Sequence, residues 1–210
     1  MDIKTKRNGQ WVDAELYTKR NGVWVKADAY TKRNGQWVNL TTQTYTKTWT
    51  ATWTQTYREA GTKRTDYRSE KICQGRYVIE PWGIMCSFIG FGDIQSELAG
   101  AKIKSVELFL HNEHWYYYAG GLALLGYHNN SYRPNTNTGN VVYGAVKEKF
   151  DYRGQSKWIT MPNNFAEGIR DGSYKGVSMF AWTTDMQYYG IFSGANDGDN
   201  APKLKITYEK

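Results

Sequence analysis

The chain has 210 residues and a formal net charge of +7 at pH 7, and its 9 Trp, 17 Tyr and 7 Phe outnumber its Leu, Ile and Val residues. These numbers predict one folded β-rich domain with a small appendage, with aromatic residues both in the core and on the surface. The longest apolar run, residues 122–125, is far short of the ~20 residues of a membrane helix, and no apolar secretory signal opens the chain. Because glycine-rich phosphate loops and metal-type Cys/His spacings are also absent, we expect no cofactor, no metal, no membrane insertion and synthesis in the cytosol.

Residues 1–41 contain a repeat of 13 residues, in which the segment Thr-Lys-Arg-Asn-Gly is followed after one residue by Trp-Val. Asn-Gly is the favoured pair for a two-residue type I′ turn, so each copy predicts a β-hairpin of about five residues a side. Counting outward from each turn places a Lys opposite a Trp, where the Lys stem packs across the strands and makes a cation–π contact. The three pairs are Lys6 and Trp11, Lys19 and Trp24, and Lys32 and Trp37.

Two interpretations of the repeats stay open. The hairpins can form a structural meander that attaches the chain to something else, with the Trp side chains used for packing. They can also offer three equivalent aromatic and basic binding sites, as a lectin repeat does.

Residues 42–57 alternate strictly, with Thr at every even position and Tyr45, Trp49, Trp53 and Tyr57 among the odd ones. A period of two over this length, built from β-branched and aromatic residues, predicts a β-strand. Since it is longer than most globular strands, we expect it to bend or to pass from one sheet to another. It then bridges the repeats and the main domain.

Residues 58–210 contain many short strand candidates separated by turn signals, which is typical of a β-sandwich or jelly roll. One short helix is expected over residues 163–171, weakened by Gly168. The fold class that we predict is therefore all-β, a jelly-roll β-sandwich preceded by a small repeat of β-hairpins. The expected strands are residues 71–79, 84–91, 102–110, 115–118, 122–127, 141–150, 157–161, 176–183, 188–193 and 204–208.

The sequence favours no catalytic or metal site. The strand pattern places His114 on the inward face, with His111 opposite, and a hairpin through residues 120–121 brings His128 to the face of His114. Two histidines can begin a metal site, but no third ligand is evident, and histidines bonded to the backbone are the simpler interpretation. Residues 196–200 are rich in Asp and Asn but lack calcium-loop spacing, so they predict a solvated turn. No two carboxylates can be paired as in a glycosidase, and we expect no enzyme.

Aromatic binding surfaces are better candidates. Residues 115–118 place aromatic side chains on both faces of a strand end, and a second aromatic group surrounds Asp185 near an expected loop. Sugar rings stack on such faces, while Asp, Asn and His hydrogen-bond the hydroxyls. The alternative is that these aromatic residues belong to the core or to a subunit contact. The candidate carbohydrate-binding residues are His114, Trp115, Tyr117, His128, Trp182, Asp185, Tyr188 and Tyr189.

Three motifs occur in an order that resembles a known family: LAGAKIKSVEL at residues 98–108, HWYYYAGGLALLGYH at 114–128 and PKLKITY at 202–208. This order resembles the C-terminal jelly-roll domain of minor tail or tail-fibre proteins of phages that infect Gram-positive bacteria. The Lys-x-Asn-Gly-x-Trp repeats are likewise similar to segments of such proteins. The resemblance spans roughly residues 43–208. Family members usually have a long preceding chain, so this sequence is either a small whole protein or the end of a larger one.

The resemblance implies a non-enzymatic virion protein, assembled in the host cytoplasm, whose jelly-roll domain binds bacterial cell-wall polysaccharide and whose repeats act as stalk or attachment. It also implies other virion proteins as partners and a homo-oligomer, with a trimer favoured. Two alternatives remain, a purely structural capsid or tail decoration protein and a carbohydrate-binding accessory module of a wall hydrolase. We expect no nucleic-acid partner, because the Lys and Arg residues beyond the repeats are spread along the chain.

Overall fold

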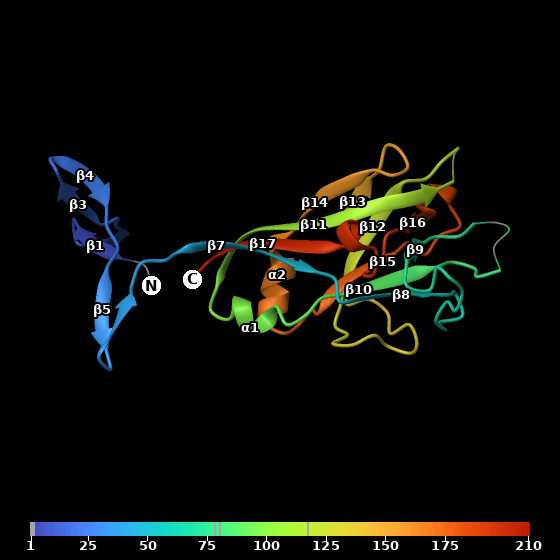
Figure 1. Ribbon diagram of the computed structural model, residues 1–210, viewed down its shortest axis with the longest axis horizontal. Coiled ribbons are helices and arrows are strands. Elements are labelled where there is room, and N and C mark those ends of the chain that lie inside the picture. The colour runs from blue at the N-terminus through green and yellow to red at the C-terminus, as the bar shows by residue number, and fades with distance from the viewer. Residues whose placement is uncertain (1–2, 78, 80, 117) are drawn as a thin grey trace. The chain divides into compact units, whose positions relative to one another are not determined.

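The computed structural model describes residues 3–77, 79, 81–116 and 118–210. The chain forms two compact units (Figure 1), which we call the hairpin unit (Met1–Tyr45 with Glu209–Lys210) and the sandwich unit (Thr46–Tyr208). The boundary falls inside the alternating segment, after Tyr45. In the described part of the chain, no helix is long and apolar enough to cross a membrane.

The hairpin unit contains three antiparallel hairpins, each a separate two-stranded sheet. The turn residues Asn8, Asn21 and Asn34 have φ between 47° and 49°, and each following Gly has φ of 82° or 84°. Positive φ at both central positions is the type I′ geometry, so the predicted hairpins are confirmed. Their strands are β1 (Lys4–Arg7), β2 (Gln10–Asp13), β3 (Tyr17–Arg20), β4 (Val23–Lys26), β5 (Tyr30–Arg33) and β6 (Gln36–Asn39).

The sandwich unit is built from two sheets, which confirms the all-β class with a β-sandwich preceded by hairpins. The five-stranded sheet has the order β13-β12-β15-β10-β8, and the six-stranded sheet has the order β7-β17-β11-β16-β9 with β14 paired to β11. The strands are β7 (Thr44–Thr50), β8 (Trp53–Tyr57), β9 (Ile72–Gln74), β10 (Cys86–Gly90), β11 (Lys102–Trp115), β12 (Leu122–His128), β13 (Val142–Lys149), β14 (Ser156–Met161), β15 (Gly176–Phe180), β16 (Gly190–Phe192) and β17 (Lys203–Glu209).

The alternating segment passes from one sheet to the other, as predicted. Its first part is β7 in the six-stranded sheet, and its second part is β8 in the five-stranded sheet. At the crossing, the Ala51 N–H donates to the Pro202 carbonyl and the Thr52 N–H donates to the Gly90 carbonyl. All five residues of β8 are buried, whereas β7 is mostly exposed, so the segment enters the sandwich at this point.

The expected strand over residues 115–118 is wrong. Trp115 instead ends the long strand β11, and Tyr118 lies in a turn. The register of β11 with β16 shifts between Asn112 and His114, which marks a β-bulge. A bulge adds one residue to one strand and so reverses the face of the residues after it. Trp115 therefore enters the core, and His114 does not.

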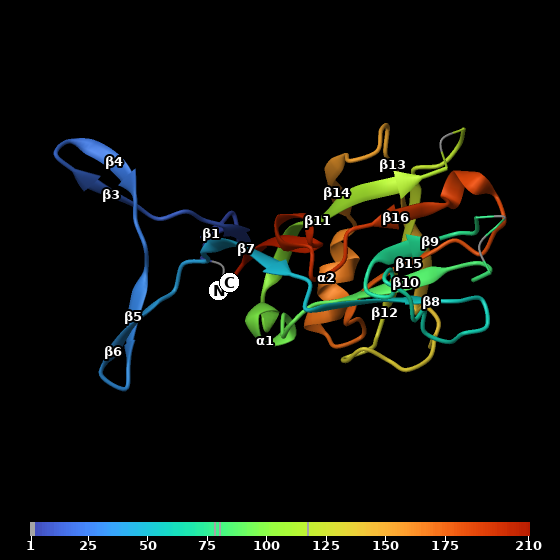
Figure 2. The ribbon, with the colours of Figure 1, turned by 45° about the vertical axis from the view of Figure 1, so that its right-hand side comes forward.

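Two helices, α1 (Gln95–Leu98) and α2 (Asn163–Arg170), lie side by side at one end of the sandwich unit (Figures 1 and 2). Helix α2 confirms the predicted helix, while α1 was not expected from the sequence. Gly168 lowers helix propensity, but the ring of Tyr174 occupies the space that a Cβ at this position would take. Packing therefore accounts for the glycine.

Aromatic residues fill much of the core between the sheets. Tyr127 stacks on Phe165 with ring centroids 4.5 Å apart, and Phe150 packs edge-on against Phe192 at 5.2 Å. These four side chains are almost completely buried. Each brings a large apolar area into a fold that is short of aliphatic residues.

Candidate functional site

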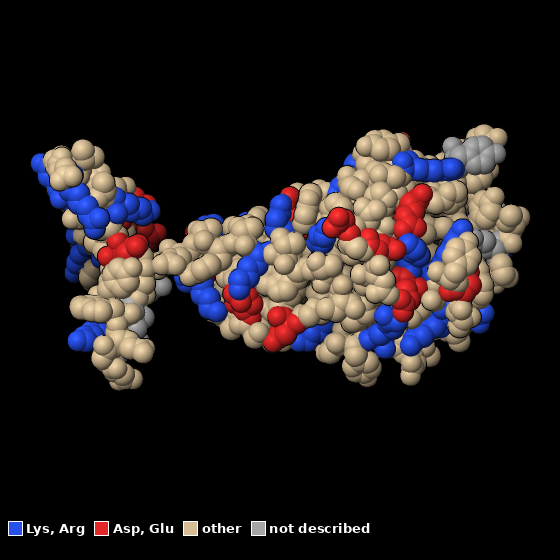
Figure 3. Space-filling view, in the orientation of Figure 1, with Lys and Arg blue, Asp and Glu red and all other residues tan. Residues whose placement is uncertain are grey.

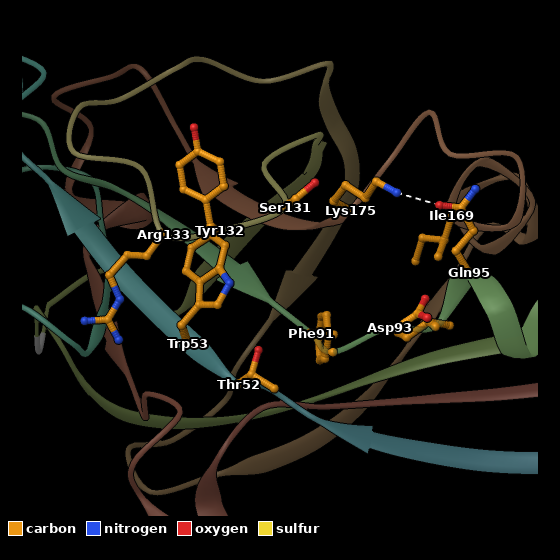
Figure 4. Close-up of a pocket in the computed structure, with 12 residues that line it drawn as sticks. Thr52, Trp53, Phe91, Asp93, Gln95, Ser131, Tyr132, Arg133, Ile169 and Lys175 are labelled. Carbon is orange, nitrogen blue, oxygen red and sulfur yellow. Dashed lines mark hydrogen bonds between the residues drawn. The ribbon is translucent and has the colours of Figure 1, made fainter.

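A cleft of about 460 Å³ opens in the sandwich unit (Figure 4). It lies where the start of β8 meets two loops, residues 91–95 after β10 and residues 131–133 after β12. Ile169 of α2 and Lys175 close one end. The volume is within the range of small-ligand sites, about 300–1,000 Å³.

Aromatic rings form the floor and one wall of this cleft. Trp53 and Phe91 line it with only 9 % and 7 % of their surfaces exposed, whereas Tyr132 is 76 % exposed. Trp53 is the direct strand partner of Gly90, and a Cβ at Gly90 would overlap the indole. The glycine thus lets the indole lie against the sheet, and Tyr132 projects beside it from the loop (Figure 4).

Polar side chains stand around the rings. Lys175 Nζ donates to Gln95 Oε1 at 2.6 Å, the hydrogen bond drawn in Figure 4. Asp93 accepts a hydrogen bond from the Ser96 N–H. The pKa of the Asp93 carboxyl is lowered chiefly by a hydrogen bond with the Ser96 side chain, then by this backbone contact, with a smaller contribution from Lys175. Arg133 lies on the opposite side, where its Nη1 donates to Glu70 Oε1 at 2.6 Å. The cleft therefore combines an apolar floor with two cations, one carboxylate and an amide.

His128 supports the cleft from behind. It is completely buried, with its ring 5.6 Å from that of Trp53 and 5.0 Å from that of Phe88. Its Nδ1 accepts from the Asn130 N–H, so the neutral ring donates from Nε2 to the Ile89 carbonyl. Burial lowers the pKa of His128 to about 4. The prediction that His128 shares a face with His114 is wrong, because the two residues belong to different sheets.

The structure brings two other predicted residues together, but as a packing cluster. Tyr189 is 2 % exposed and stacks on Tyr77 with ring centroids 5.3 Å apart, while His114 contacts Tyr189 edge-on. Trp115 is buried in the main core. This arrangement matches the interpretation of these aromatic residues as core. Tyr117 lies outside the described residues.

The remaining predicted residues lie apart from the cleft lining. Trp182 is 52 % exposed and packs beside Phe180. Asp185 Oδ1 accepts from the Gln187 N–H and so caps the short 3₁₀ helix Met186–Tyr188. Lys147 Nζ lies 5.3 Å from the Tyr188 ring. The carboxylate of Asp185 thus has a structural role in its own turn.

In the hairpin unit the predicted register is confirmed, since Lys6, Lys19 and Lys32 lie directly opposite Trp11, Trp24 and Trp37. Lys19 and Lys32 place Nζ 6.0 Å from the facing indole. The three indoles are 66–70 % exposed. They are therefore not packed into a core.

No group of three or more His, Cys, Asp and Glu side chains within the described residues is arranged to hold a metal ion. In the Asp/Asn-rich turn, Asp197 accepts hydrogen bonds from Lys71 Nζ and the Gly194 N–H. These contacts occupy the Asp197 carboxylate within the protein, while Asn196 and residues 198–200 are exposed, as in the predicted solvated turn.

Reasoning from the sequence missed the cleft. Trp53, Phe91 and Tyr132 come from three separate segments: Trp53 stood in the alternating strand, Phe91 ended the expected strand 84–91, and Tyr132 lay in no expected element. No local spacing links the three residues, because long-range strand pairing brings them together. Comparison of the sequence with protein-family models and with curated proteins finds no match.

Proposed function

We propose that this protein is a non-catalytic saccharide-binding component of a phage tail or tail fibre, which attaches to bacterial cell-wall polysaccharide. The observation that carries the binding function is the cleft formed by Trp53, Phe91 and Tyr132 with polar groups at its margin. Concave sites with an apolar aromatic lining and a few convergent polar groups are the usual form of small-ligand sites.

The chemistry of the cleft fits a sugar ring. The apolar face of a pyranose stacks on the exposed ring of Tyr132, and the edge of Trp53 extends the same surface. Asp93 accepts hydrogen bonds from hydroxyl groups, and Lys175 donates to ring or hydroxyl oxygens. The two cations at the margin also favour a sugar that carries an acidic group.

A binding role is favoured over hydrolysis by the composition of the lining. Asp93 is the single carboxylate among the described residues that line the cleft. Glycosidases use two carboxyl groups about 5–9 Å apart, one on each side of the bond that they cleave. The proposal therefore assigns no catalytic residue.

The virion assignment rests on the sequence resemblance. It includes other virion proteins as partners, a stalk or attachment role for the hairpin unit and a homotrimer. Native mass spectrometry tests the trimer directly. A mass of three chains is expected, and a monomer would favour a glycan-binding module or a decoration protein that acts as a single chain.

Binding to isolated cell walls tests the function. Labelled protein is expected to sediment with intact walls of Gram-positive bacteria and not with walls stripped of their polysaccharides. Tyr132→Ala removes the exposed ring and should lower the affinity about tenfold without unfolding. Tyr152→Ala, which removes a 61 % exposed ring outside the cleft, is the matched control. Absence of binding to every wall preparation would overturn the proposal and favour a purely structural decoration protein.

A further inference from the structure

Each hairpin presents one face that carries both lysine and aromatic side chains. Successive residues of a strand point to opposite faces, and directly opposed residues share a face. In the second hairpin, Lys19 and Tyr17 of β3 therefore share a face with Trp24 and Lys26 of β4. We call this the Lys–Trp face. The first hairpin has Lys4, Lys6, Trp11 and Asp13 on this face, and the third has Tyr30, Lys32, Trp37 and Asn39.

These faces are open to solvent. The indoles of Trp11, Trp24 and Trp37 are 67 %, 66 % and 70 % exposed, and Tyr17 and Tyr30 are 52 % and 54 % exposed. By contrast, the threonines on the opposite faces, Thr5, Thr18 and Thr31, are half-buried. Large apolar groups left together on a surface mark a place where a partner binds. The same pattern recurs in all three hairpins.

The charge of the hairpin unit indicates the chemistry of the partner. Residues 3–41 contain eight Lys and Arg against three Asp and Glu. Figure 3 shows Lys and Arg side chains along the hairpins. A basic surface attracts anions over about a Debye length, and an indole beside an ammonium group offers a flat apolar platform next to a positive charge. A pyranose ring that carries a carboxylate or phosphate group complements both features.

Each Lys–Trp face is suited to one ring rather than to a continuous strand. Proteins that bind single-stranded nucleic acid combine a basic groove along the backbone with a series of stacked aromatic residues. Here each hairpin is a separate two-stranded sheet with a single indole. This arrangement favours isolated sugar units of a polymer.

We propose that the hairpin unit is a trivalent binding surface for an anionic polysaccharide, with one acidic sugar unit bound at each Lys–Trp face. Three weak sites on one chain act together, because binding at the first raises the effective concentration of polymer at the others. The surface shares no residue with the cleft of Trp53 and Tyr132. The two proposals can therefore fail independently.

Calorimetric titration of the full chain with three polymers of matched length tests the inference. Polygalacturonate supplies rings and charge, dextran supplies rings without charge, and polyphosphate supplies charge without rings. Polygalacturonate is expected to bind at least about tenfold more tightly than either of the others, with an affinity that falls as salt rises. Tyr152→Ala, which lies outside both the cleft and the Lys–Trp faces, is expected to leave this binding unchanged.

Substitutions locate the sites. Replacing Trp by Ala in one, two and then three hairpins should lower the affinity at each step, with a loss of about a hundredfold for Trp11→Ala/Trp24→Ala/Trp37→Ala together. The matched control, Thr5→Ala/Thr18→Ala/Thr31→Ala, changes the opposite faces and should bind as the parent does. NMR shifts of the turn glycine amides report whether the hairpins stay folded. A further variant, Lys6→Gln/Lys19→Gln/Lys32→Gln, removes three positive charges and keeps the indoles, and it should also bind polygalacturonate more weakly.

Several results would overturn the inference. Equal binding of polyphosphate would show that charge alone acts, and unchanged binding by the triple Trp variant with folded hairpins would place the site elsewhere. Tighter binding of an oligothymidylate than of polygalacturonate would indicate a nucleic-acid ligand. Absence of polygalacturonate binding would also refute it, whether or not the cleft binds cell walls.

Discussion

The indole of Trp53 lies over Gly90, its direct partner in the neighbouring strand, and fills the space that a side chain there would need. The same indole lines the cleft, and the buried ring of His128 packs against it. One glycine on β10 thus sets the position of the floor of the proposed binding site. We therefore expect a substitution at Gly90 to affect both the stability of the sandwich unit and the proposed binding.

Gly90→Ala is expected to destabilise the sandwich unit by about 2 kcal/mol, because the new Cβ overlaps the indole in a packed sheet. It should also weaken wall binding by displacing Trp53. The control is Gly92→Ala, whose Cβ would meet Thr52 Cγ2 at an ordinary distance of 3.8 Å. Urea denaturation measures both variants. Equal urea midpoints for Gly90→Ala and Gly92→Ala would show that the Trp53 indole can move aside without cost.

The buried His128 predicts a pH-dependent stability. Its pKa is lowered to about 4 by burial, below the ordinary value of 6.5, so the folded state favours the neutral ring. The stabilisation is complete above pH 6.5 and is lost as pH falls toward 4, because the unfolded chain then binds the proton more readily. Between pH 7 and 5 the free energy of unfolding should fall by about 2 kcal/mol from this group alone.

His128→Gln removes the titrating imidazole. The free energy of unfolding of this variant should therefore change less between pH 7 and 5 than that of the parent protein. His111→Gln, which replaces a partly exposed histidine hydrogen-bonded to Ser156, is the control and should keep the slope of the parent. Urea denaturation at three pH values gives the change in the free energy of unfolding with pH for each protein. Identical slopes for all three proteins would rule out a neutral buried His128.

An ion pair with a buried arginine predicts a second stability effect. The side chain of Arg64 is 2 % exposed, and its Nε and Nη2 donate to the two oxygens of Asp66 at 2.7 and 2.8 Å. Asp66→Ala leaves the guanidinium without this carboxylate and should cost about 2–3 kcal/mol.

The matched control for this ion pair lies at the surface. Asp171→Ala removes the partner of Arg170 from a pair in which the Asp171 side chain is 57 % exposed. Surface pairs contribute little, so about 0.5 kcal/mol or less is expected. Thermal and urea unfolding of the two variants make the comparison. If Asp66→Ala lowers the free energy of unfolding no more than Asp171→Ala does, water must reach the Arg64 guanidinium.

The two cysteines are expected to be unreactive in the folded protein. Cys73 and Cys86 are buried, and burial raises the pKa of the Cys86 thiol to about 12. Since the thiolate is the reactive form, modification by a thiol reagent at pH 8 should be about a hundredfold slower than in urea. Absorbance of the released thiolate follows the reaction. Fast labelling of the native protein would contradict the packing around β9 and β10.

Local chemistry explains which parts of the fold can be predicted. Asn8 and Gly9 favour a type I′ turn by themselves, and the turn then sets the pairing of Lys6 with Trp11. The helix at residues 163–170 likewise follows from signals within a few residues. The β-bulge after Asn112 has no such local signal, so the face of His114 was predicted wrongly.

The sequence by itself determined the hairpin repeats, the alternating segment and the all-β class, because turn residues and period-two patterns act over a few neighbouring positions. Only the tertiary structure decided where the cleft lies, since Trp53, Phe91 and Tyr132 meet through strand pairing between distant segments. It also decided that His128 is buried and that the three hairpin indoles are exposed. Burial depends on what the rest of the chain packs against a side chain, and a local pattern does not contain that information.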